Sequence, residues 1–213
     1  MSGLLLLAAL ASTAPGSCGT AAPADTLPAD SLEALYARGR SFAEFLEAAR
    51  ARQDTWRNNY AWGKIDPELL NRARALPEGW RLLVVADDSC GDSANTIPWV
   101  ATLVDSLAGR IDMRVLTSRE AQLIKDTHRT HDGRAATPTV VLLDPEGREA
   151  GCWVERPGAL AAWARGEGSG LSQREFLDRK YAWYDADRGR ETLRDMLRMI
   201  EQAGPGRACL GNT

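Results

Sequence analysis

The sequence RLLVVADDSCGDSANTIPW, residues 81–99, contains an apolar run followed at once by a change of hydrophobic period. The run Leu82–Ala86 is short, continuous and rich in branched side chains, which predicts a buried β-strand. After Cys90 the apolar residues recur at helical spacing, at Ile97, Val100, Ala101, Val104 and Leu107. The stretch therefore predicts a strand that ends shortly before Cys90 and a helix that begins shortly after it.

This pattern places Cys90 at the N-terminus of a helix. Unpaired backbone N–H groups and the positive end of the helix dipole favour an anionic thiolate there, and the thiolate is the reactive form of cysteine. The alternative is a small, buried and inert cysteine. Asp87, Asp88 and Asp92 stand close by in the sequence. Their charges either tune the thiol or oppose its ionisation, and the sequence leaves this open.

The bulk composition excludes several classes of function. With 213 residues, the chain forms one domain with extensions or two small domains. A net charge of −3 suggests no polyanion partner, so no nucleic acid is expected. No apolar run is long enough to span a membrane. The four cysteines, which form neither a C-x-x-C pair nor a disulfide scaffold, are Cys18, Cys90, Cys152 and Cys209.

A metal site is not expected either. A four-cysteine zinc site needs paired spacing, which is missing here. His128 and His131 form an H-x-x-H pair near the end of a predicted helix, but no third ligand is evident. Both histidines are therefore expected to be solvated loop residues, and no metal or cofactor is predicted.

The first residues resemble an export signal. Residues 4–11 form a short apolar run followed by small residues up to Cys18, which predicts a secretory signal peptide, although no basic residue precedes the run. Pro15-Gly-Ser-Cys18 resembles a lipoprotein box with proline in place of an aliphatic residue, so a lipid anchor at Cys18 is the alternative. Export to the periplasm or cell envelope follows from either form. If the segment is not a working signal, it is a frayed terminus of a cytoplasmic protein.

Five segments follow from these patterns. We predict a signal peptide or lipoprotein signal over 1–22, a linker over 23–30, a helical extension over 31–79, a main domain over 80–166 and a second helical extension over 167–213. The first extension shows a capping box at Ser41–Glu44, and its aromatic-rich residues 56–62 are expected to pack against the main domain. In the second, Ser172–Glu175 caps a long helix that Gly189 is expected to interrupt. The tail up to Cys209 is predicted to be loose.

The main domain alternates between strand and helix patterns. The order β-α-β-α-β-β-α predicts an α/β sandwich with one mixed sheet. The expected ranges are strand 82–86, helix 93–108, strand 111–117, helix 118–128, strands 140–143 and 150–154, and a helix from 159 to 165.

Over residues 80–165 the chain resembles the thioredoxin-like superfamily. Cys90-Gly-Asp-Ser93 stands at the strand–helix junction, where that family carries Cys-x-x-Cys, and Pro98 lies inside the following helix. Thr137-Pro138-Thr139 is similar to the family's cis-proline loop. The resemblance implies a thioredoxin-like fold, with a central mixed sheet flanked by helices and added N- and C-terminal helices. It also implies a cis Thr137–Pro138 bond beside the thiol.

The chain departs from the family at three positions. Ser89 replaces a tryptophan, Val84 replaces a buried acid, and Ser93 replaces the second cysteine. The Ser93 hydroxyl can donate to a Cys90 thiolate, but it cannot attack a mixed disulfide as a second thiolate does.

Another cysteine of the chain is not favoured as the resolving thiol. Cys152 is expected to pair near Val141 or Leu142, too far from Pro138 for a direct bridge. Cys209 could reach Cys90 only through a flexible tail. An external thiol is therefore expected to resolve the intermediate.

Two functions remain open. The first is thiol–disulfide exchange by a monothiol mechanism, with Cys90 and Ser93 as catalytic residues. The partners would be protein thiols or disulfides, or small thiols resembling glutathione. The second is a redox-inactive binding module that presents the groove between Cys90 and Pro138. The oligomeric state is not predicted. The expected substrate-binding residues are Gly91, Asp92, Thr137 and Pro138.

Overall fold

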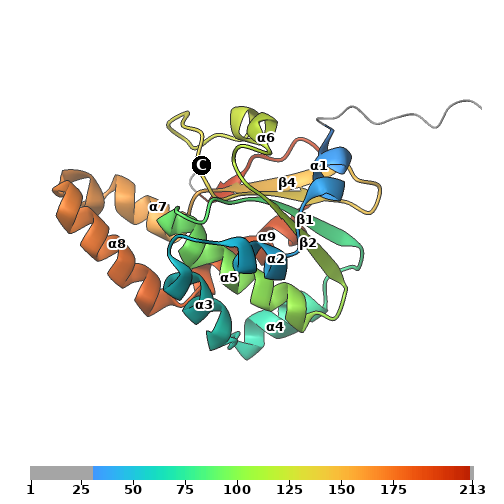
Figure 1. Ribbon diagram of the computed structural model, residues 1–213, viewed down its shortest axis with the longest axis horizontal. Coiled ribbons are helices and arrows are strands. Elements are labelled where there is room, and N and C mark those ends of the chain that lie inside the picture. Colours follow the sequence, from blue (N-terminus) through green and yellow to red (C-terminus); the bar gives the residue numbers. More distant parts are fainter. Residues whose placement is uncertain (1–30, 212–213) are drawn as a thin grey trace, which may run out of the picture.

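The computed structural model describes residues 31–211, and one five-stranded sheet runs through the middle of them (Figure 1). The strand order is β2-β1-β3-β4-β5. The strands are β1 (Trp80–Val85), β2 (Ile111–Leu116), β3 (Thr139–Leu143), β4 (Glu149–Val154) and β5 (Leu210–Gly211). The helices are α1 (Leu32–Arg38), α2 (Phe42–Ala48), α3 (Gln53–Trp62), α4 (Pro67–Arg74), α5 (Gly91–Ser106), α6 (Gln122–Thr127), α7 (Gly158–Arg165), α8 (Gln173–Asp187) and α9 (Arg190–Glu201), with a 3₁₀ turn, η1 (Glu167–Gly170), before α8.

The sheet is mixed, as predicted. β1 pairs in parallel with β2 through the α5 crossover, and it pairs antiparallel with β3 on its other side. β3 and β4 form the expected antiparallel hairpin. The predicted α/β thioredoxin-like fold is confirmed.

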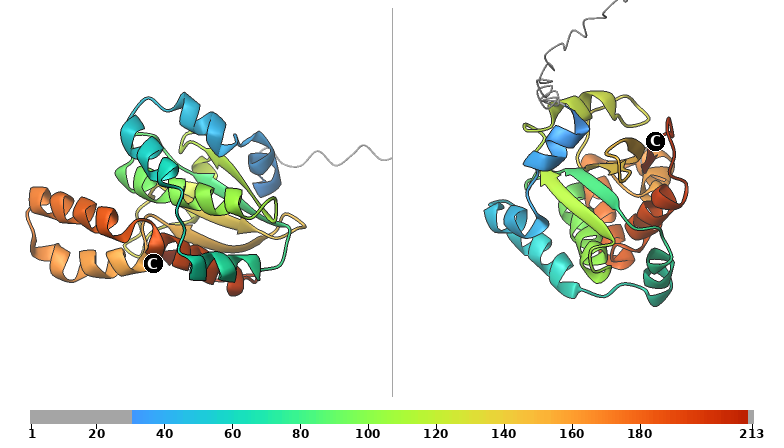
Figure 2. Two further views of the ribbon diagram at one scale, coloured as in Figure 1. Left: turned by 90° about the horizontal axis from the view of Figure 1, so that it is seen from below. Right: turned by 90° about the vertical axis from the view of Figure 1, so that its right-hand side faces the viewer.

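The core lies on both faces of the sheet. Leu82 and Val84 pack into the cluster under α3, α5 and α9, whereas Leu83 and Val85 pack into a smaller cluster under α1 and α6. Side chains of a strand alternate between faces, so a central strand covered on both sides has to be apolar throughout. This explains the continuous run in β1. The two views of Figure 2 show helices on both sides of the sheet and α7 and α8 extending beyond one end.

The N-terminal extension is part of the main core. The aromatic-rich residues 56–62, for which no helix was predicted, lie in α3. Trp56 is fully buried, its ring centroid lies 5.1 Å from that of Phe45, and its indole N–H donates to the Asp88 carbonyl at 2.9 Å. The prediction that this patch packs against the main domain is confirmed for Trp56, whereas Trp62 is exposed.

The C-terminal extension also follows its predicted breaks. The capping box at Ser172 and Glu175 starts α8, and Gly189, with φ of +75°, separates α8 from α9. A Cβ atom at Gly189 would collide with the Trp99 ring. The turn therefore needs glycine both for its backbone angle and for its close contact with α5.

Three predictions about the periphery are wrong. The tail is not loose up to Cys209, because Cys209 forms a disulfide with Cys152 and the next two residues pair with β4 as β5. His128 is not solvated: it is 8% exposed and contacts Glu149, whereas His131 is exposed. The helix predicted from residue 118 starts later, at Gln122, because Glu120 binds the backbone N–H of Thr117 and closes a turn first.

In the part of the chain that the structure describes, no helix is both long enough and apolar enough to cross a membrane. The predicted signal peptide, the linker and the Cys18 anchor fall within residues 1–30, outside the described residues.

Candidate active site at Cys90

Cys90 is the N-cap residue of α5 and follows the end of β1 by five residues, as the change of period predicted. Its backbone is extended, with φ of −76° and ψ of 123°, and its carbonyl accepts the first helical hydrogen bond from Ala94. Its sulfur accepts from the backbone N–H of Ser93 at 3.4 Å. The residue is partly exposed. The thiol is thus accessible and sits at the positive end of a 16-residue helix.

The predicted cis-proline loop lies directly against this thiol. The Thr137–Pro138 bond is cis, and the Cys90 thiol donates to the Thr137 carbonyl at 3.1 Å. The two segments are 47 residues apart in sequence. They meet because β1 and β3 are antiparallel neighbours with Val85 opposite Thr139, so the end of one strand lies beside the start of the other.

Ser93 contacts the thiol through its backbone, whereas hydroxyl donation was predicted. The side chain is fully buried, and among the described residues its hydroxyl oxygen has no hydrogen-bond partner. The helix turn points the backbone N–H, rather than the side chain, at the Cys90 sulfur. The donor is therefore supplied by the start of the helix and does not depend on serine at this position.

Two of the three nearby acids are held by backbone groups. Asp87 accepts from the Ser118 N–H at 3.0 Å. Asp88 accepts from the N–H groups of Arg50 and Ala51 at 2.7 and 2.9 Å, and these hydrogen bonds lower the pKa of Asp88. These acids bind the loop before Cys90 to the segment that follows β2 and to the N-terminal extension.

Asp92 is buried, and its carboxylate is bound by C-terminal residues. It accepts from the Lys180 ammonium at 3.1 Å and from the Tyr184 hydroxyl at 2.7 Å, and the Arg156 guanidinium lies 3.5 Å away. Burial, and then the charge of Asp92, raise the pKa of Tyr184 well above its usual value, so the phenol keeps its proton and donates. The Asp92 carboxylate thus faces α8 and binds protein groups, whereas the sequence predicted a contact with substrate.

Both extensions reach the Cys90-Gly-Asp-Ser93 motif. From α8, the Tyr181 hydroxyl lies against Gly91, where a Cβ atom would collide with it. From the N-terminal extension, Arg52 donates to the Ser89 carbonyl at 2.7 Å, and its guanidinium lies 5.8 Å from the Tyr181 ring centroid. The sequence pattern placed Tyr181 only on the face of a helix, and nothing in it pointed to Gly91.

The remaining two cysteines of the described chain are joined to each other. Cys152 lies opposite Val141, as the predicted hairpin register required, and is bonded to Cys209. Cys90 is the free cysteine among residues 31–211. This corrects the idea that Cys209 reaches Cys90 through a loose tail.

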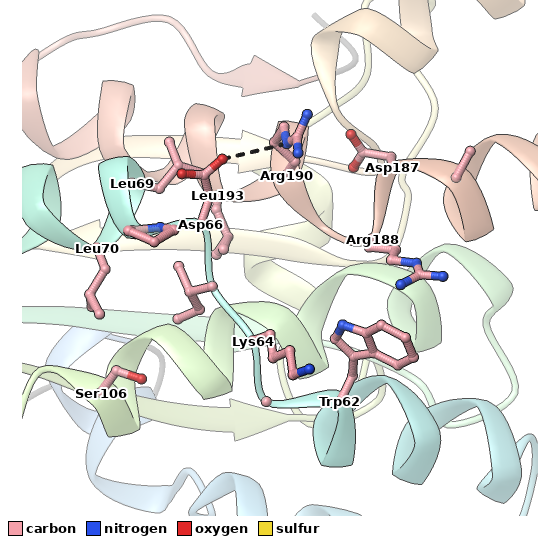
Figure 3. Close-up of a pocket in the computed structure, with 14 residues that line it drawn as sticks. Trp62, Lys64, Asp66, Leu69, Leu70, Ser106, Asp187, Arg188, Arg190 and Leu193 are labelled. Atoms are coloured by element: carbon pink, nitrogen blue, oxygen red, sulfur yellow. Dashed lines mark ion pairs between the residues drawn. The ribbon is translucent and has the colours of Figure 1, made fainter.

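A cavity of about 660 Å³ lies elsewhere, between the α3–α4 connection and the α8–α9 junction (Figure 3). Arg188 stacks over the Trp62 ring at 4.0 Å on its wall, and Asp66 lies 3.9 Å from Arg190. Burial raises the pKa of Asp187 there to about 6. Its lining does not include Cys90 or Pro138, so the thiol chemistry belongs to a different surface.

The mixed sheet, the cysteine at the start of α5 and the adjoining cis-proline define an α/β protein of the thioredoxin-like class. A family model described as thioredoxin matches residues 39–173, and the chain belongs to this family. The matched range includes most of the N-terminal extension as well as strands β1 to β4 of the sheet. No curated protein matches the sequence.

Two solved structures are similar in fold. A protein of unknown function from Pseudomonas aeruginosa is 21% identical, with a TM-score of 0.62, over 80% of this chain and 97% of that one. An HIV epitope-scaffold protein is 22% identical, with a TM-score of 0.64, over 82% of this chain and 99% of that one. At these identities the likeness concerns the fold.

Proposed function

We propose that the protein carries out thiol–disulfide exchange through Cys90 by a monothiol mechanism. One observation carries this proposal: the partly exposed Cys90 sulfur lies between the Ser93 N–H, at 3.4 Å, and the Thr137 carbonyl, at 3.1 Å. The thiolate is the attacking species in thiol–disulfide exchange, and the Ser93 N–H at the start of α5 is a donor that can contact it. The carbonyl is not a base, so the thiol proton passes to solvent water.

The exchange proceeds in two balanced steps. The Cys90 thiolate attacks one sulfur of a substrate disulfide, an S–S bond forms to Cys90, and the substrate S–S bond breaks. The second substrate sulfur leaves as a thiolate and takes a proton from water. Because Ser93 has no sulfur, an external thiolate then attacks the mixed disulfide and releases Cys90. Protein thiols and small thiols resembling glutathione are the proposed partners.

The cis-proline loop supports binding of an extended substrate segment. Thr137 presents its backbone beside the thiol, in the loop two residues before β3 begins. An extended chain can pair with exposed loop backbone of this kind through main-chain hydrogen bonds. Gly91, Thr137 and Pro138 are therefore the proposed contact residues.

The second candidate is a binding module without redox turnover. The observation that favours it is the Tyr181 side chain against Gly91, together with Ser93 in place of a second thiol. In this function the groove between Cys90 and Pro138 binds a partner protein, and the thiol contributes no chemistry.

Export is proposed alongside either function. The apolar run over residues 4–11 supports it, as does the Cys152–Cys209 disulfide, because structural disulfides persist mainly in oxidising compartments. Mass spectrometry of the protein from its native host tests this, since an intact Met1 on cytoplasmic protein would contradict it. A lipid mass on Cys18 would support the anchor.

The test of the exchange function uses Ser93→Cys. Wild type should show little reductase turnover with a protein disulfide and a supplied reductant, because the intermediate has no internal resolving thiol. Ser93→Cys restores two thiols at nearly constant volume in a fully buried position, so it should introduce turnover. Adding Cys90→Ser to that variant should abolish it. A folded Ser93→Cys protein that stays inert would favour the binding module.

A further inference from the structure

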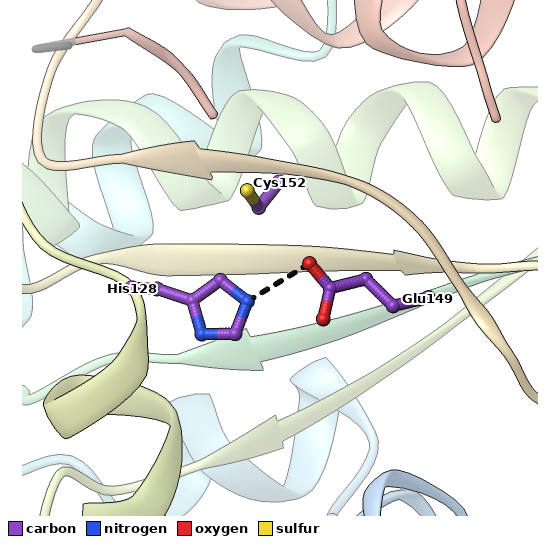
Figure 4. A group of neighbouring side chains, drawn as sticks. All are labelled: His128, Glu149 and Cys152. Atoms are coloured by element: carbon purple, nitrogen blue, oxygen red, sulfur yellow. Dashed lines mark hydrogen bonds and ion pairs between the residues drawn. The ribbon is translucent and has the colours of Figure 1, made fainter. Parts of the chain in front are cut away.

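Three potential metal ligands lie together on the face of the sheet opposite α9. The donor atoms of His128, Glu149 and Cys152 are all within 4.8 Å of one another (Figure 4). His128 and Cys152 are 8% and 3% exposed, and Glu149 is partly exposed. Two of the three ligands are thus buried, and solvent reaches the cluster at the Glu149 carboxylate.

A β-bulge brings two of these ligands to one face. Cys152 lies opposite Val141 and Glu149 lies opposite Leu143, so Ala150 is one residue more than the facing strand provides. Without this extra residue, Glu149 and Cys152 would point to opposite faces, because they are three positions apart.

His128 is oriented as metal-bound histidines are. Its Nδ1 lies 3.1 Å from the Ile124 carbonyl and 2.9 Å from the Thr127 hydroxyl. The carbonyl can only accept, and the hydroxyl already donates to the Leu123 carbonyl, so both contacts fit an Nδ1 that carries a proton. This leaves Nε2 facing the Glu149 carboxylate at 3.1 Å. A backbone acceptor on the far ring nitrogen is the usual arrangement behind a ligating histidine.

A fourth donor is adjacent through the disulfide. The register of β4 with β5 places Trp153 beside Leu210, and therefore Cys152 beside its partner Cys209. Two sulfurs, one imidazole nitrogen and one carboxylate oxygen make up a ligand set that suits tetrahedral Zn²⁺. We propose that reduction of the Cys152–Cys209 disulfide creates a zinc site formed by His128, Glu149, Cys152 and Cys209.

The chemistry balances with a dithiol as reductant. The dithiol supplies two electrons and two protons and closes into its own disulfide, while the Cys152–Cys209 bond breaks and two thiols form. Zn²⁺ then displaces both thiol protons, and any proton on His128 Nε2, into solvent. The sulfurs must separate from about 2.0 Å in a disulfide to about 3.8 Å in a tetrahedral site. Cys209 lies outside the helices, between Gly206 and the short β5, where the chain can make this shift.

The experiment compares the reduced and oxidised full chain in a Cys90→Ser background, so that Cys90 cannot supply a ligand. A phosphine performs the reduction in place of a dithiol, which would itself bind zinc. The phosphine supplies the two electrons and takes an oxygen atom from water, whose two protons pass to the sulfurs. Zinc affinity is measured by competition with a chromophoric chelator. We expect one Zn²⁺ per reduced chain and at least 100-fold weaker binding by the oxidised chain. His128→Gln and Glu149→Gln should each weaken binding by at least about tenfold. His131→Gln, the matched control at an exposed histidine, should leave it unchanged.

Two results would overturn the proposal. One is a reduced chain that binds zinc no better than the oxidised chain. The other is undiminished binding in the His128→Gln/Glu149→Gln double variant, which would place the metal elsewhere. Circular dichroism is recorded in parallel. If the reduced chain loses its fold, adding Zn²⁺ should restore it, and failure to do so counts against the site.

Discussion

At the residue scale, the environment of Cys90 consists mainly of backbone groups. The Ser93 N–H and the Thr137 carbonyl contact the sulfur, and both are placed by the ends of secondary-structure elements. Side chains act one step further out, through Asp88 and Asp92. Replacing either side chain should therefore lower the stability of the loop more than it changes the reactivity of the Cys90 thiol.

Asp92→Asn tests this distinction. The change leaves the Lys180 ammonium and the Arg156 guanidinium, 6% and 9% exposed, without their shared carboxylate. Breaking a buried pair by removing one charge costs about 3–5 kcal/mol, and the retained amide oxygen reduces this to about 2–4 kcal/mol. Urea unfolding measures the loss. Adding Lys180→Met to Asp92→Asn should recover part of it, and purely additive losses would contradict the pairing.

At the element scale, α8 covers the start of α5. Tyr181 is the residue of α8 that lies against Gly91, while Lys180 and Tyr184 bind Asp92 one residue further along. The sequence predicted α8 from its capping box, but a helix face alone does not reveal what it covers.

Tyr181→Ala should make the start of α5 more accessible to solvent. Removing the ring exposes Gly91 and the neighbouring thiol, so alkylation of Cys90 should become several-fold faster. Leu177→Ala, at a 36% exposed position on the same helix, is the control and should leave the rate near that of wild type. Equal rates for Tyr181→Ala and wild type would show that the ring does not limit access.

The α8–α9 junction should contribute a pH dependence through Asp187. Burial raises the pKa of this carboxyl to about 6, above its unfolded value of about 3.9. Its contribution to folding is therefore complete at low pH and is lost as the pH rises through about 6. After discounting for partial exposure, the loss is about 1–2 kcal/mol. Asp187→Asn should flatten the fall in unfolding free energy between about pH 4 and pH 7. An unchanged slope would refute the assignment.

At the scale of the whole molecule, one disulfide joins the C-terminal segment to the sheet. The Cys152–Cys209 bond closes a loop with a sequence separation of 57 residues. Chain-entropy reasoning gives about 4 kcal/mol for such a loop, and native disulfides contribute about 2–5 kcal/mol. Cys152→Ser/Cys209→Ser should lose about that much unfolding free energy under oxidising conditions. Under reducing conditions without added metal, wild type and the variant should have the same free energy of unfolding. A difference that persists would show that the stability loss does not come from the disulfide.

Local pattern was sufficient for the central strands and α5, because each is set by residues near it in sequence. The cis-proline loop was expected from the resemblance to the thioredoxin-like superfamily. Contacts between distant segments were not predictable in the same way. The Asp92 network depends on where α8 folds back. The His128–Glu149 contact depends on a bulge at Ala150, which turns the Glu149 side chain to the other face of the sheet. Ala150 itself is neither glycine nor proline, so the sequence gives no sign of the bulge at that residue. The disulfide was missed because the short β5 has too few residues to show a strand pattern.

The most direct test of the exchange function is the mass of the protein after incubation with a small disulfide of the glutathione type. Exchange through Cys90 predicts one adduct of one half-disulfide on Cys90, located by peptide mapping, and its removal by an added small thiol. Cys90→Ser should acquire none, and Cys152 and Cys209 should remain bonded to each other. A wild-type protein that stays unmodified at Cys90 while folded would contradict the exchange mechanism and favour the binding module.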